Sequence, residues 1–339
     1  MSLLGIDLGG TKAAFALFNT RGEMMSKESF LLGRRKGKEV GKLITSKISS
    51  ANERLMSTGE KVESIGVSVP GISRSQSGTV WAPNIEGWED YPLLSEIKKM
   101  TGDIPVTIDS DRSCSIMGEL WKGNARGCMD AIFLTVGTGI GAGILADGEV
   151  LRGSDDIAGA IGWMALARPF REKYRTCGCF EFHSSGTGLA RSAMNIISKE
   201  KDNISAPEKK LSGKITAQDL FNSFENGEKA AKKVIKEHIE NWGMAVANLV
   251  SIFNPEKIIF GGGVFGPARQ FIPQIRSEAE KWAQPLAMKK VSIEVSALSG
   301  DAALYGAGFL ALRKIKDKGK KLKRSEDPDR SVRSVGNKS

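Results

Sequence analysis

The sequence has few of the features that mark secreted and membrane proteins. It has four cysteines in 339 residues, too few for a disulfide framework. No apolar run reaches the ~18 residues that are needed to cross a bilayer. The N-terminus "MSLLGIDLGGTK" has no basic segment followed by a long apolar core, so we do not expect a signal peptide. These absences predict a protein of the reducing cytoplasm that has no membrane partner.

Two common nucleotide-binding motifs are also missing. None of the glycine-rich segments has four residues between a glycine and Gly-Lys-Ser/Thr, as in a P-loop, and none is interpreted as a Gly-x-Gly-x-x-Gly that opens a helix within a βαβ unit. The sequence does have three glycine-rich turns, near residues 9, 139 and 262, and each follows a short apolar strand. Because glycine lets the backbone approach an anion and point N–H groups at it, these turns predict phosphate-binding loops of another kind.

Acidic residues are too few to balance the basic ones, and the net charge is +10. Residues 313–339 carry 11 Lys or Arg and 4 Asp or Glu, a net of +7, which leaves only +3 for the rest of the chain. We therefore expect no specific nucleic-acid site. Residues 316–339 have almost no large apolar side chains and are predicted to form a disordered basic tail. A basic arm that contacts nucleic acid or an acidic membrane is the alternative.

The length and the order of the elements predict two domains. A chain of 339 residues is long for one core, and its 40% hydrophobic and 26% charged content is typical of a globular protein. The strands "LLGIDLGG" and "AAFALFN" predict a hairpin, which "DAIFLTVGTGIGAGILADGEV" repeats. Helical spacing follows in "RSCSIMGELWKG", "AAKKVIKEHIENWGMAVANLVSIF" and "SGDAALYGAGFLALRK". We interpret the repeat as an internal duplication of one α/β domain.

Several motifs together resemble one family. "GIDLGGTKAAFALFNTRGE", "FLTVGTGIGAGILADGEV" and "IIFGGGVFG" look like the two phosphate motifs and the adenosine motif of the actin-like ATPase superfamily. "GVSVPG", "APNIEGW", "IDSDRSCSIMGELWKG", "LRGSDDIAGAIGWM" and "CGCFEFHSSG" follow the order of its ROK family of bacterial sugar kinases and regulators. The resemblance covers about residues 3–314. It implies two ribonuclease-H-like α/β domains, residues 1–114 with 303–315 and residues 115–302, with ATP and a sugar in the interdomain cleft.

The ATP site that the resemblance implies draws on all three glycine turns. Seven turn residues would contact the nucleotide: Gly9, Gly10, Thr11, Thr138, Gly139, Gly262 and Gly263. Lys12 would add positive charge beside the first turn. Asp7 ends the first strand and suits Mg²⁺, bound through water because this ion keeps several of its waters. The alternatives are that Asp7 caps a turn and that Gly262 and Gly263 end a close-packed strand.

Asp111 is the predicted general base. Phosphoryl transfer to a sugar needs a base near the attacked hydroxyl. The family's Asn-Asp-Ala-Asn segment aligns with Ser110-Asp111-Arg112-Ser113. Asp109 is a competing carboxylate, and Asp111 could instead cap the helix that starts there. Ser110 replaces an asparagine that contacts the sugar in the family, although a hydroxyl can still bind a sugar.

The sugar-binding end departs from the family pattern. The usual Glu-Ile-Gly-His reads Ala160-Ile161-Gly162-Trp163, which replaces two polar sugar contacts by a methyl group and by an indole that can stack on a sugar ring. Glu181 keeps the position of a carboxylate at the anomeric end. Gly71 and Asn84 would also face the sugar, with simple turn positions as the alternative. These departures predict weak glucose binding or a preference for another hexose.

The stretch "RTCGCFEFHSSG" at first resembles a metal site. Cys177, Cys179, Glu181 and His183 occupy alternate positions, which share one face of an extended chain, and all are metal-ligand types. In the family register, however, only Cys179 matches a zinc ligand. Residues two apart on a strand also lie ~6.5 Å apart, too far to share an ion without a sharp turn. The sequence predicts no zinc site and structural roles for His183 and His238.

The resemblance predicts an ATP-dependent, Mg²⁺-dependent sugar kinase that is glucokinase-like and acts on a hexose 6-hydroxyl. A homodimer is possible because dimers and tetramers are common in the family. A non-catalytic sugar sensor and a degenerate nucleotide-binding protein are the alternatives. Sensors of the family usually carry a helix-turn-helix domain before the first phosphate motif, which here begins by residue 5, so we expect none. Ala160 and Trp163 favour a degenerate protein, whereas Asp111 and the intact phosphate motifs oppose it.

Overall fold

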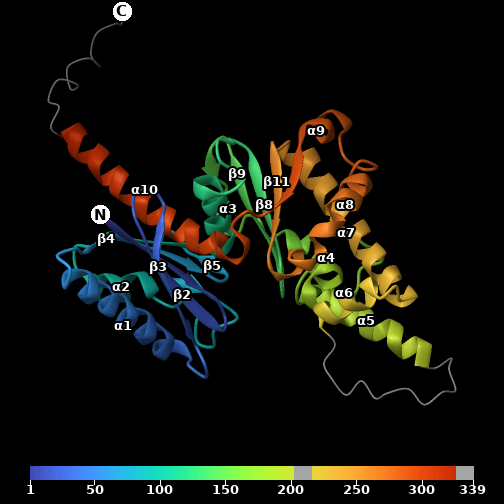
Figure 1. The fold of residues 1–339 in the computed structure, drawn as a ribbon, viewed down its shortest axis with the longest axis horizontal. Helices are drawn as coiled ribbons and strands as arrows, with labels where there is room; N and C mark the ends of the chain where they lie inside the picture. Colours follow the sequence, from blue (N-terminus) through green and yellow to red (C-terminus); the bar gives the residue numbers. More distant parts are fainter. Residues whose placement is uncertain (202–215, 326–339) are drawn as a thin grey trace, which may run out of the picture. The chain divides into compact units, whose positions relative to one another are not determined.

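The structure is a computed structural model that describes residues 1–201 and 216–325, arranged in two compact units (Figure 1). Unit 1 consists of residues 1–111 and the helix that continues from Leu304, and unit 2 consists of the described part of residues 112–303. Each unit contains one five-stranded sheet, ordered β3-β2-β1-β4-β7 in unit 1 and β10-β9-β8-β11-β12 in unit 2. Both sheets join two antiparallel pairs to two parallel pairs. The two sheets therefore share one topology, as the interpretation of an internal duplication predicts.

Five strands form the sheet of unit 1. The strands are β1 (Ser2–Leu8), β2 (Lys12–Phe18), β3 (Met24–Leu31), β4 (Val62–Val69) and β7 (Val106–Ser110), with a two-stranded ladder of β5 (Ile72–Ser73) and β6 (Val80–Trp81). The helices are α1 (Gly37–Met56), α2 (Leu93–Thr101) and α10 (Ala302–Ser325).

Unit 2 follows the same plan and carries more helices. Its strands are β8 (Ala131–Val136), β9 (Ile140–Ala146), β10 (Glu149–Val150), β11 (Lys257–Gly261) and β12 (Ser292–Val295). Its α-helices are α3 (Asp111–Lys122), α4 (Cys179–Ser184), α5 (Gly186–Lys201), α6 (Ala217–Glu225), α7 (Lys229–Phe253), α8 (Ile272–Ala279) and α9 (Pro285–Lys290). Its 3-10 turns are η1 (Ile161–Trp163), η2 (Glu172–Arg175), η3 (Gly263–Phe265), η4 (Pro267–Phe271) and η5 (Ser299–Asp301).

The sheet of unit 1 is covered on both faces, which explains why its parallel strands are apolar throughout. Leu4 and Ile6 of β1 belong to the core cluster that also contains buried residues of α1 and α2. On the opposite face, a Cβ atom at Gly66 of β4 would lie 1.9 Å from the carbonyl oxygen of Ala307 in α10. Only a glycine at this position lets α10 pack this closely against the sheet.

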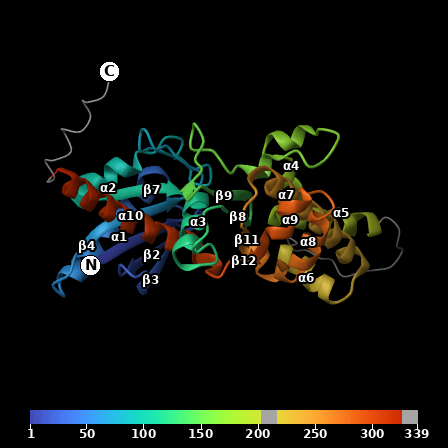
Figure 2. The same ribbon diagram turned by 90° about the horizontal axis from the view of Figure 1, so that it is seen from above.

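The core of unit 2 lies between its sheet and the long helix α7. Figure 2 shows α7, α8 and α9 gathered beside β11 and β12. Buried residues of β8 and β11, such as Ile132 and Ile258, share one apolar cluster with α7. Trp242 of α7 is completely buried in this cluster and donates its Nε1–H to the carbonyl of Ser184, 3.1 Å away. The long helical periodicity of "AAKKVIKEHIENWGMAVANLVSIF" therefore produces the central helix of the unit.

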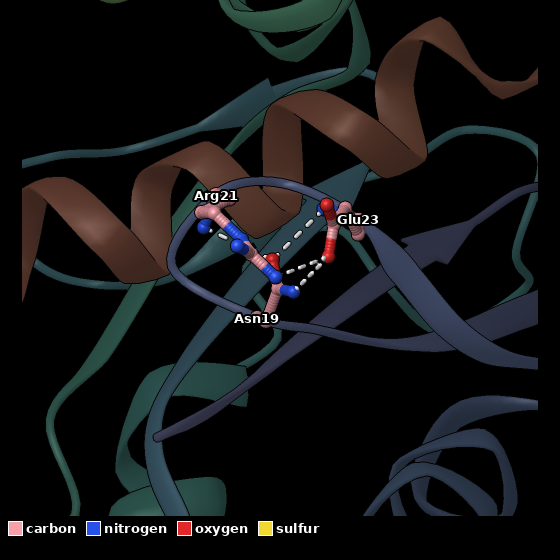
Figure 3. A network of polar contacts seen from close by, with 3 residues as sticks. All are labelled: Asn19, Arg21 and Glu23. Carbon is pink, nitrogen blue, oxygen red and sulfur yellow. Dashed lines mark hydrogen bonds and ion pairs between the residues drawn. The ribbon is translucent and has the colours of Figure 1, made fainter.

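The turn between β2 and β3 is closed by polar side chains (Figure 3). The side-chain oxygen of Asn19 accepts hydrogen bonds of 3.0 Å from the backbone N–H groups of Arg21 and Glu23. Arg21 and Glu23 form an ion pair of 3.2 Å across the same turn. Asparagine side chains favour turns because they bond the backbone two residues on. The turn at residues 19–23 thus has a local cause.

The C-terminal helix is longer than the sequence predicts. We expected residues 316–339 to be a disordered tail, but α10 continues to Ser325, so residues 316–325 are helical. Lys, Arg and Leu are good helix formers, and extending an existing helix costs less than starting one. Residues 326–339 lie outside the described residues. Among the described residues, no helix is long and apolar enough to span a bilayer.

Candidate functional site

The carboxyl ends of β1, β4 and β7 meet at one edge of the sheet of unit 1, where ligands of open α/β sheets bind. Asp7, Ser68 and Asp109 are register partners on these three strands and form one row. The hydroxyl of Ser68 donates to Oδ1 of Asp7 at 2.8 Å. Asp7 is half-buried and Ser68 is fully buried. The structure therefore fixes the Asp7 carboxylate while leaving part of it accessible.

Asp7 fits the Mg²⁺ role that the sequence predicts for it. Mg²⁺ usually takes one or two protein carboxylates and keeps several waters. Among residues 1–201 and 216–325, no group of three or more His, Cys, Asp or Glu side chains is placed to hold a metal. A carboxylate oriented by one hydroxyl suits an ion that is held mainly by water and phosphate oxygens.

The first glycine turn links β1 to β2 and lies against a predicted sugar contact. The N–H of Gly9 donates to the carbonyl of Lys12 at 2.9 Å, which closes the turn tightly. A Cβ atom at Gly10 would lie 2.9 Å from Cβ of Asn84, so the turn and Asn84 touch. Thr11 and Lys12 are exposed beside them. The structure thus brings together residues predicted to bind phosphate and a residue predicted to bind the sugar.

Gly71 has a structural reason to be glycine. Its φ is +101°, a conformation that other residues rarely adopt, and a Cβ atom there would lie 2.3 Å from the carbonyl oxygen of Trp81. The turn after β4 therefore needs glycine for a close approach of two backbones. This close approach explains why residue 71 is glycine without reference to a ligand.

Exposure separates the two candidate bases. Asp109 is 2% exposed, and its Oδ1 accepts a 2.8 Å hydrogen bond from the N–H of Ser110. Asp111 is the first residue of α3 and is half-buried. A general base must come within hydrogen-bond reach of the proton that it removes, and this requirement favours Asp111. Ser110 is only 5% exposed, which leaves its hydroxyl little access to a sugar.

The second glycine turn, between β8 and β9, is held by the start of α5. The carbonyl of Gly137 accepts a hydrogen bond from the N–H of Gly186 at 2.7 Å. The hydroxyl of Thr187 donates to the carbonyl of Thr138 at 3.1 Å. Thr138 is exposed, and Gly139 follows it in the turn. The positive end of a 16-residue helix therefore lies beside backbone groups that are predicted to bind phosphate.

The sequence analysis missed the contribution of α5. Its signal is the "SSGTG" segment, in which the hydroxyl of Ser185 accepts a 3.2 Å hydrogen bond from the N–H of Gly188. A serine whose hydroxyl accepts such a bond caps the N-terminus of a helix. The local signal predicts a helix start, but only the fold shows that this start lies at the β8–β9 turn.

The third glycine turn follows β11. Its glycines Gly262 and Gly263 differ in how closely other atoms surround them. Gly262 has φ +85°, and a Cβ atom there would lie 2.4 Å from the carbonyl oxygen of Val136 at the end of β8. Gly263 is exposed, and a Cβ atom there would have no neighbour within 4 Å. Gly262 therefore serves close packing of strand ends, whereas the backbone of Gly263 is accessible to a ligand.

Glu181 of α4 contacts the β8–β9 turn directly. Its Oε2 accepts a 2.7 Å hydrogen bond from the N–H of Ile140, the residue after Gly139. Burial raises the pKa of the Glu181 carboxyl, while the hydrogen bond from Ile140 opposes that rise. The side chain is half-buried. One carboxylate oxygen is thus engaged by the turn that is predicted to bind phosphate.

Trp163 lies beside the start of the same helix. Its side chain is 58% exposed, which is unusual for such a large apolar group. Gly178, which precedes α4, has φ +83°, and a Cβ atom there would lie 2.5 Å from Cα of Trp163. A Cβ atom at Gly162 would lie 3.0 Å from Cβ of Glu181. Trp163 and Glu181 therefore belong to adjoining segments, and the indole is accessible for stacking.

The stretch that at first resembles a metal site is helical from Cys179 onward and not extended. Cys179, Glu181 and His183 lie in α4, where alternate residues do not share a face. The hydroxyl of Tyr174 and Nε2 of His183 are 2.7 Å apart. His238 is 2% exposed, and its Nδ1 lies 2.8 Å from the carbonyl oxygen of Val234. Both histidines therefore make structural contacts.

Comparison with known proteins gives a consistent result. The model of the ROK family matches residues 3–314. A glucokinase of Halalkalibacterium halodurans is 33% identical over 316 residues, which cover 91% of this chain and 94% of that protein. A xylose repressor of Caldicellulosiruptor bescii is 30% identical over 311 residues, which cover 90% of this chain and 76% of the repressor.

The solved structure of a ROK family glucokinase from Streptomyces griseus, in complex with glucose and AMPPNP, has the same fold. Its TM-score is 0.73 at 25% identity, and the match covers 92% of this chain and all of that one. The fold described above, with a mixed five-stranded sheet and helices in each unit, is therefore the actin-like ATPase fold.

Proposed function

This chain belongs to the ROK family, and on that premise we propose that it is an ATP-dependent sugar kinase that phosphorylates the 6-hydroxyl of a hexose. One observation carries the proposal. Asp111 is half-buried at the edge of the sheet that also presents Asp7 and the Gly9–Lys12 turn, whereas the neighbouring Asp109 is buried. A base, a carboxylate suited to Mg²⁺ and a phosphate-binding turn on one edge are the parts that phosphoryl transfer to an alcohol needs.

In this proposal Asp111 accepts the proton of the attacking hydroxyl. Asp7, oriented by Ser68, would hold Mg²⁺ through water, and the ion would offset the charge of the phosphates. The backbone N–H groups of the first turn and the charge of Lys12 orient the phosphates. Positioning and electrostatic stabilisation then account for most of the rate, because phosphoryl transfer requires little covalent chemistry from the protein.

Unit 2 supplies the second set of contacts. The β8–β9 turn and the N-terminus of α5 bind phosphate oxygens, and the exposed backbone of Gly263 contacts the adenosine. Glu181 binds a sugar hydroxyl at the anomeric end, and Trp163 stacks on the sugar ring. Asn84, which touches the first glycine turn, completes the sugar contacts from unit 1. We propose that the two edges enclose the substrates in one cleft that closes and excludes water.

The test is a coupled assay of ADP formation over a panel of hexoses with Mg-ATP. Asp111→Asn keeps the size of the side chain and removes the base, so we expect kcat to fall ~10²-fold or more. Asp109→Asn is the matched control, because the amide oxygen can still accept the hydrogen bond from the N–H of Ser110. The proposal predicts a much smaller loss for this control. Equal losses in the two variants would refute Asp111 as the base.

A non-catalytic sugar sensor is the second candidate, and it is favoured by the similarity to a xylose repressor. A sensor would bind a sugar in calorimetry and form no ADP with any hexose of the panel. The same panel therefore separates the two functions, since a kinase must turn over at least one sugar that it binds.

A further inference from the structure

Helix α4 is too short to set its own orientation. It has six residues, and isolated helices of this length are unstable in water. Its N-cap, Gly178, provides no side-chain cap. The position of Glu181, in the first turn of α4, therefore depends on the contacts that neighbouring segments make with this helix.

Among the hydrogen bonds that hold α4 to its surroundings, three are made by side chains of neighbouring segments. Arg191 of α5 donates to the carbonyl of Phe182 at 2.7 Å, and Trp242 of α7 donates to the carbonyl of Ser184 at 3.1 Å. The third joins the hydroxyl of Tyr174 in η2 to Nε2 of His183 at 2.7 Å. Only the third bond joins two side chains, so a substitution can remove it without changing the backbone.

The protonation states of this pair follow from their surroundings. Burial is the main cause that raises the pKa of Tyr174, which therefore keeps its proton. Burial also lowers the pKa of His183, and the positive charges of Arg171, Lys173 and Arg191 lower it further. The imidazole is thus neutral near pH 7. The phenol O–H donates to the lone pair of Nε2, and Nδ1 carries the remaining proton of the ring.

Both partners of the Tyr174–His183 hydrogen bond are connected to Glu181 through the backbone. The N–H of Gly178 donates to the carbonyl of Tyr174 at 2.8 Å, which links η2 to the start of α4. His183 lies two residues after Glu181 in the same helix. The Glu181 carboxylate in turn accepts a hydrogen bond of 2.7 Å from the N–H of Ile140. A shift of α4 would therefore move the carboxylate relative to the β8–β9 turn.

We propose that Tyr174 and His183 are positioning residues that fix α4 so that the Glu181 carboxylate stays on the N–H of Ile140, with its other oxygen directed to the sugar. The sugar contact rests on the function proposed above. The link from Tyr174 to Ile140 does not, because it is a property of unit 2 alone.

Tyr174→Phe is the informative variant. It removes the hydroxyl and keeps the ring, which packs edge-to-face against Phe170 and Phe182. We expect the KM for the sugar to rise about fivefold, the factor that corresponds to one hydrogen bond, with kcat changed less than about twofold. His183→Gln places a carbonyl oxygen where it can accept the phenol proton and should keep the KM of the wild type. His183→Leu cannot accept it and should behave like Tyr174→Phe.

A double-mutant cycle separates positioning from a general structural role. If Tyr174 acts through Glu181, then adding Tyr174→Phe to Glu181→Ala should change the sugar KM by less than about twofold. A purely structural effect would instead recur in full in the Glu181→Ala background, and that result would overturn the proposal.

Hydrogen exchange at the amide of Ile140 tests the link between Tyr174 and Ile140 without reference to catalysis. In the wild type the N–H of Ile140 is protected by Glu181, so it should exchange slowly, and Glu181→Ala is the control for fast exchange. In Tyr174→Phe the amide of Ile140 should exchange several-fold faster than in the wild type. If no hexose is phosphorylated, the proposed function fails while this measurement still decides the link. Unchanged exchange at Ile140 in Tyr174→Phe would overturn the inference.

Discussion

His238 lies in the middle of α7 with a side chain that is 2% exposed. Its Nδ1 pairs with the carbonyl of Val234 at 2.8 Å, and its Nε2 has no hydrogen-bond partner among the described residues. Burial is the largest influence on this imidazole and lowers its pKa from the ordinary 6.5 to about 4. The native protein therefore holds His238 neutral over a pH range in which the unfolded chain would protonate it.

The size of the resulting pH dependence follows from the pKa difference. A shift from 6.5 to about 4 is about 2.5 units, and at 1.36 kcal/mol per unit it corresponds to about 3.4 kcal/mol. The stabilisation is fully present above pH 6.5, falls as the pH drops below 6.5, and is lost by about pH 4. At pH 5 the loss should be about 2 kcal/mol. This is a large part of the stability of a typical domain.

Guanidinium unfolding at pH 8, 6, 5 and 4.5 measures this loss. His238→Asn is the matched variant, because its amide can donate to the carbonyl of Val234 and does not titrate. All other titrating groups are common to both proteins, so the difference between their unfolding free energies isolates His238. The wild type should lose stability relative to the variant as the pH falls. A difference that stays constant from pH 8 to 4.5 would refute the assignment of a buried neutral imidazole.

Two further predictions concern the glycine turns and the sugar site. Gly262→Ala should lower the thermal unfolding midpoint by several degrees, because a Cβ atom there meets the carbonyl oxygen of Val136 at 2.4 Å, whereas Gly263→Ala should leave it nearly unchanged. Equal unfolding midpoints for Gly262→Ala and Gly263→Ala would contradict the packing described for Gly262. Trp163→Ala should leave stability within about 0.5 kcal/mol and raise the sugar KM several-fold, because the indole is 58% exposed. A large loss of stability in calorimetry would show that Trp163 belongs to the core.

Local signals in the sequence were sufficient for the hairpins and the glycine turns. A short apolar strand, a glycine-rich turn and a second apolar strand predict the β1–β2 hairpin, and the same order predicts the β8–β9 hairpin. The repeat of this pattern also predicts the shared topology of the two sheets, which the structure confirms. These features depend on neighbouring residues and on alternation, which a single sequence displays.

Features that depend on distant residues could not be predicted in this way. The start of α5 bonds to Thr138, 49 residues earlier, and Glu181 bonds to Ile140, 41 residues away. The alternation of Cys179, Glu181 and His183 suggests an extended chain, but the segment becomes helical after Gly178 and packs against α7. The burial of Asp109, which favours Asp111 as the base, is likewise a property of the folded sheet.

The central claim is that this chain transfers a phosphoryl group from ATP to a hexose. The most direct measurement is mass spectrometry of the sugar after incubation with Mg-ATP and the purified protein, with the Asp111→Asn variant beside it. The account predicts that at least one hexose gains one phosphoryl group, and that the variant forms this product at least ~10²-fold more slowly. A sugar panel that stays unmodified while the protein still binds ATP would contradict it.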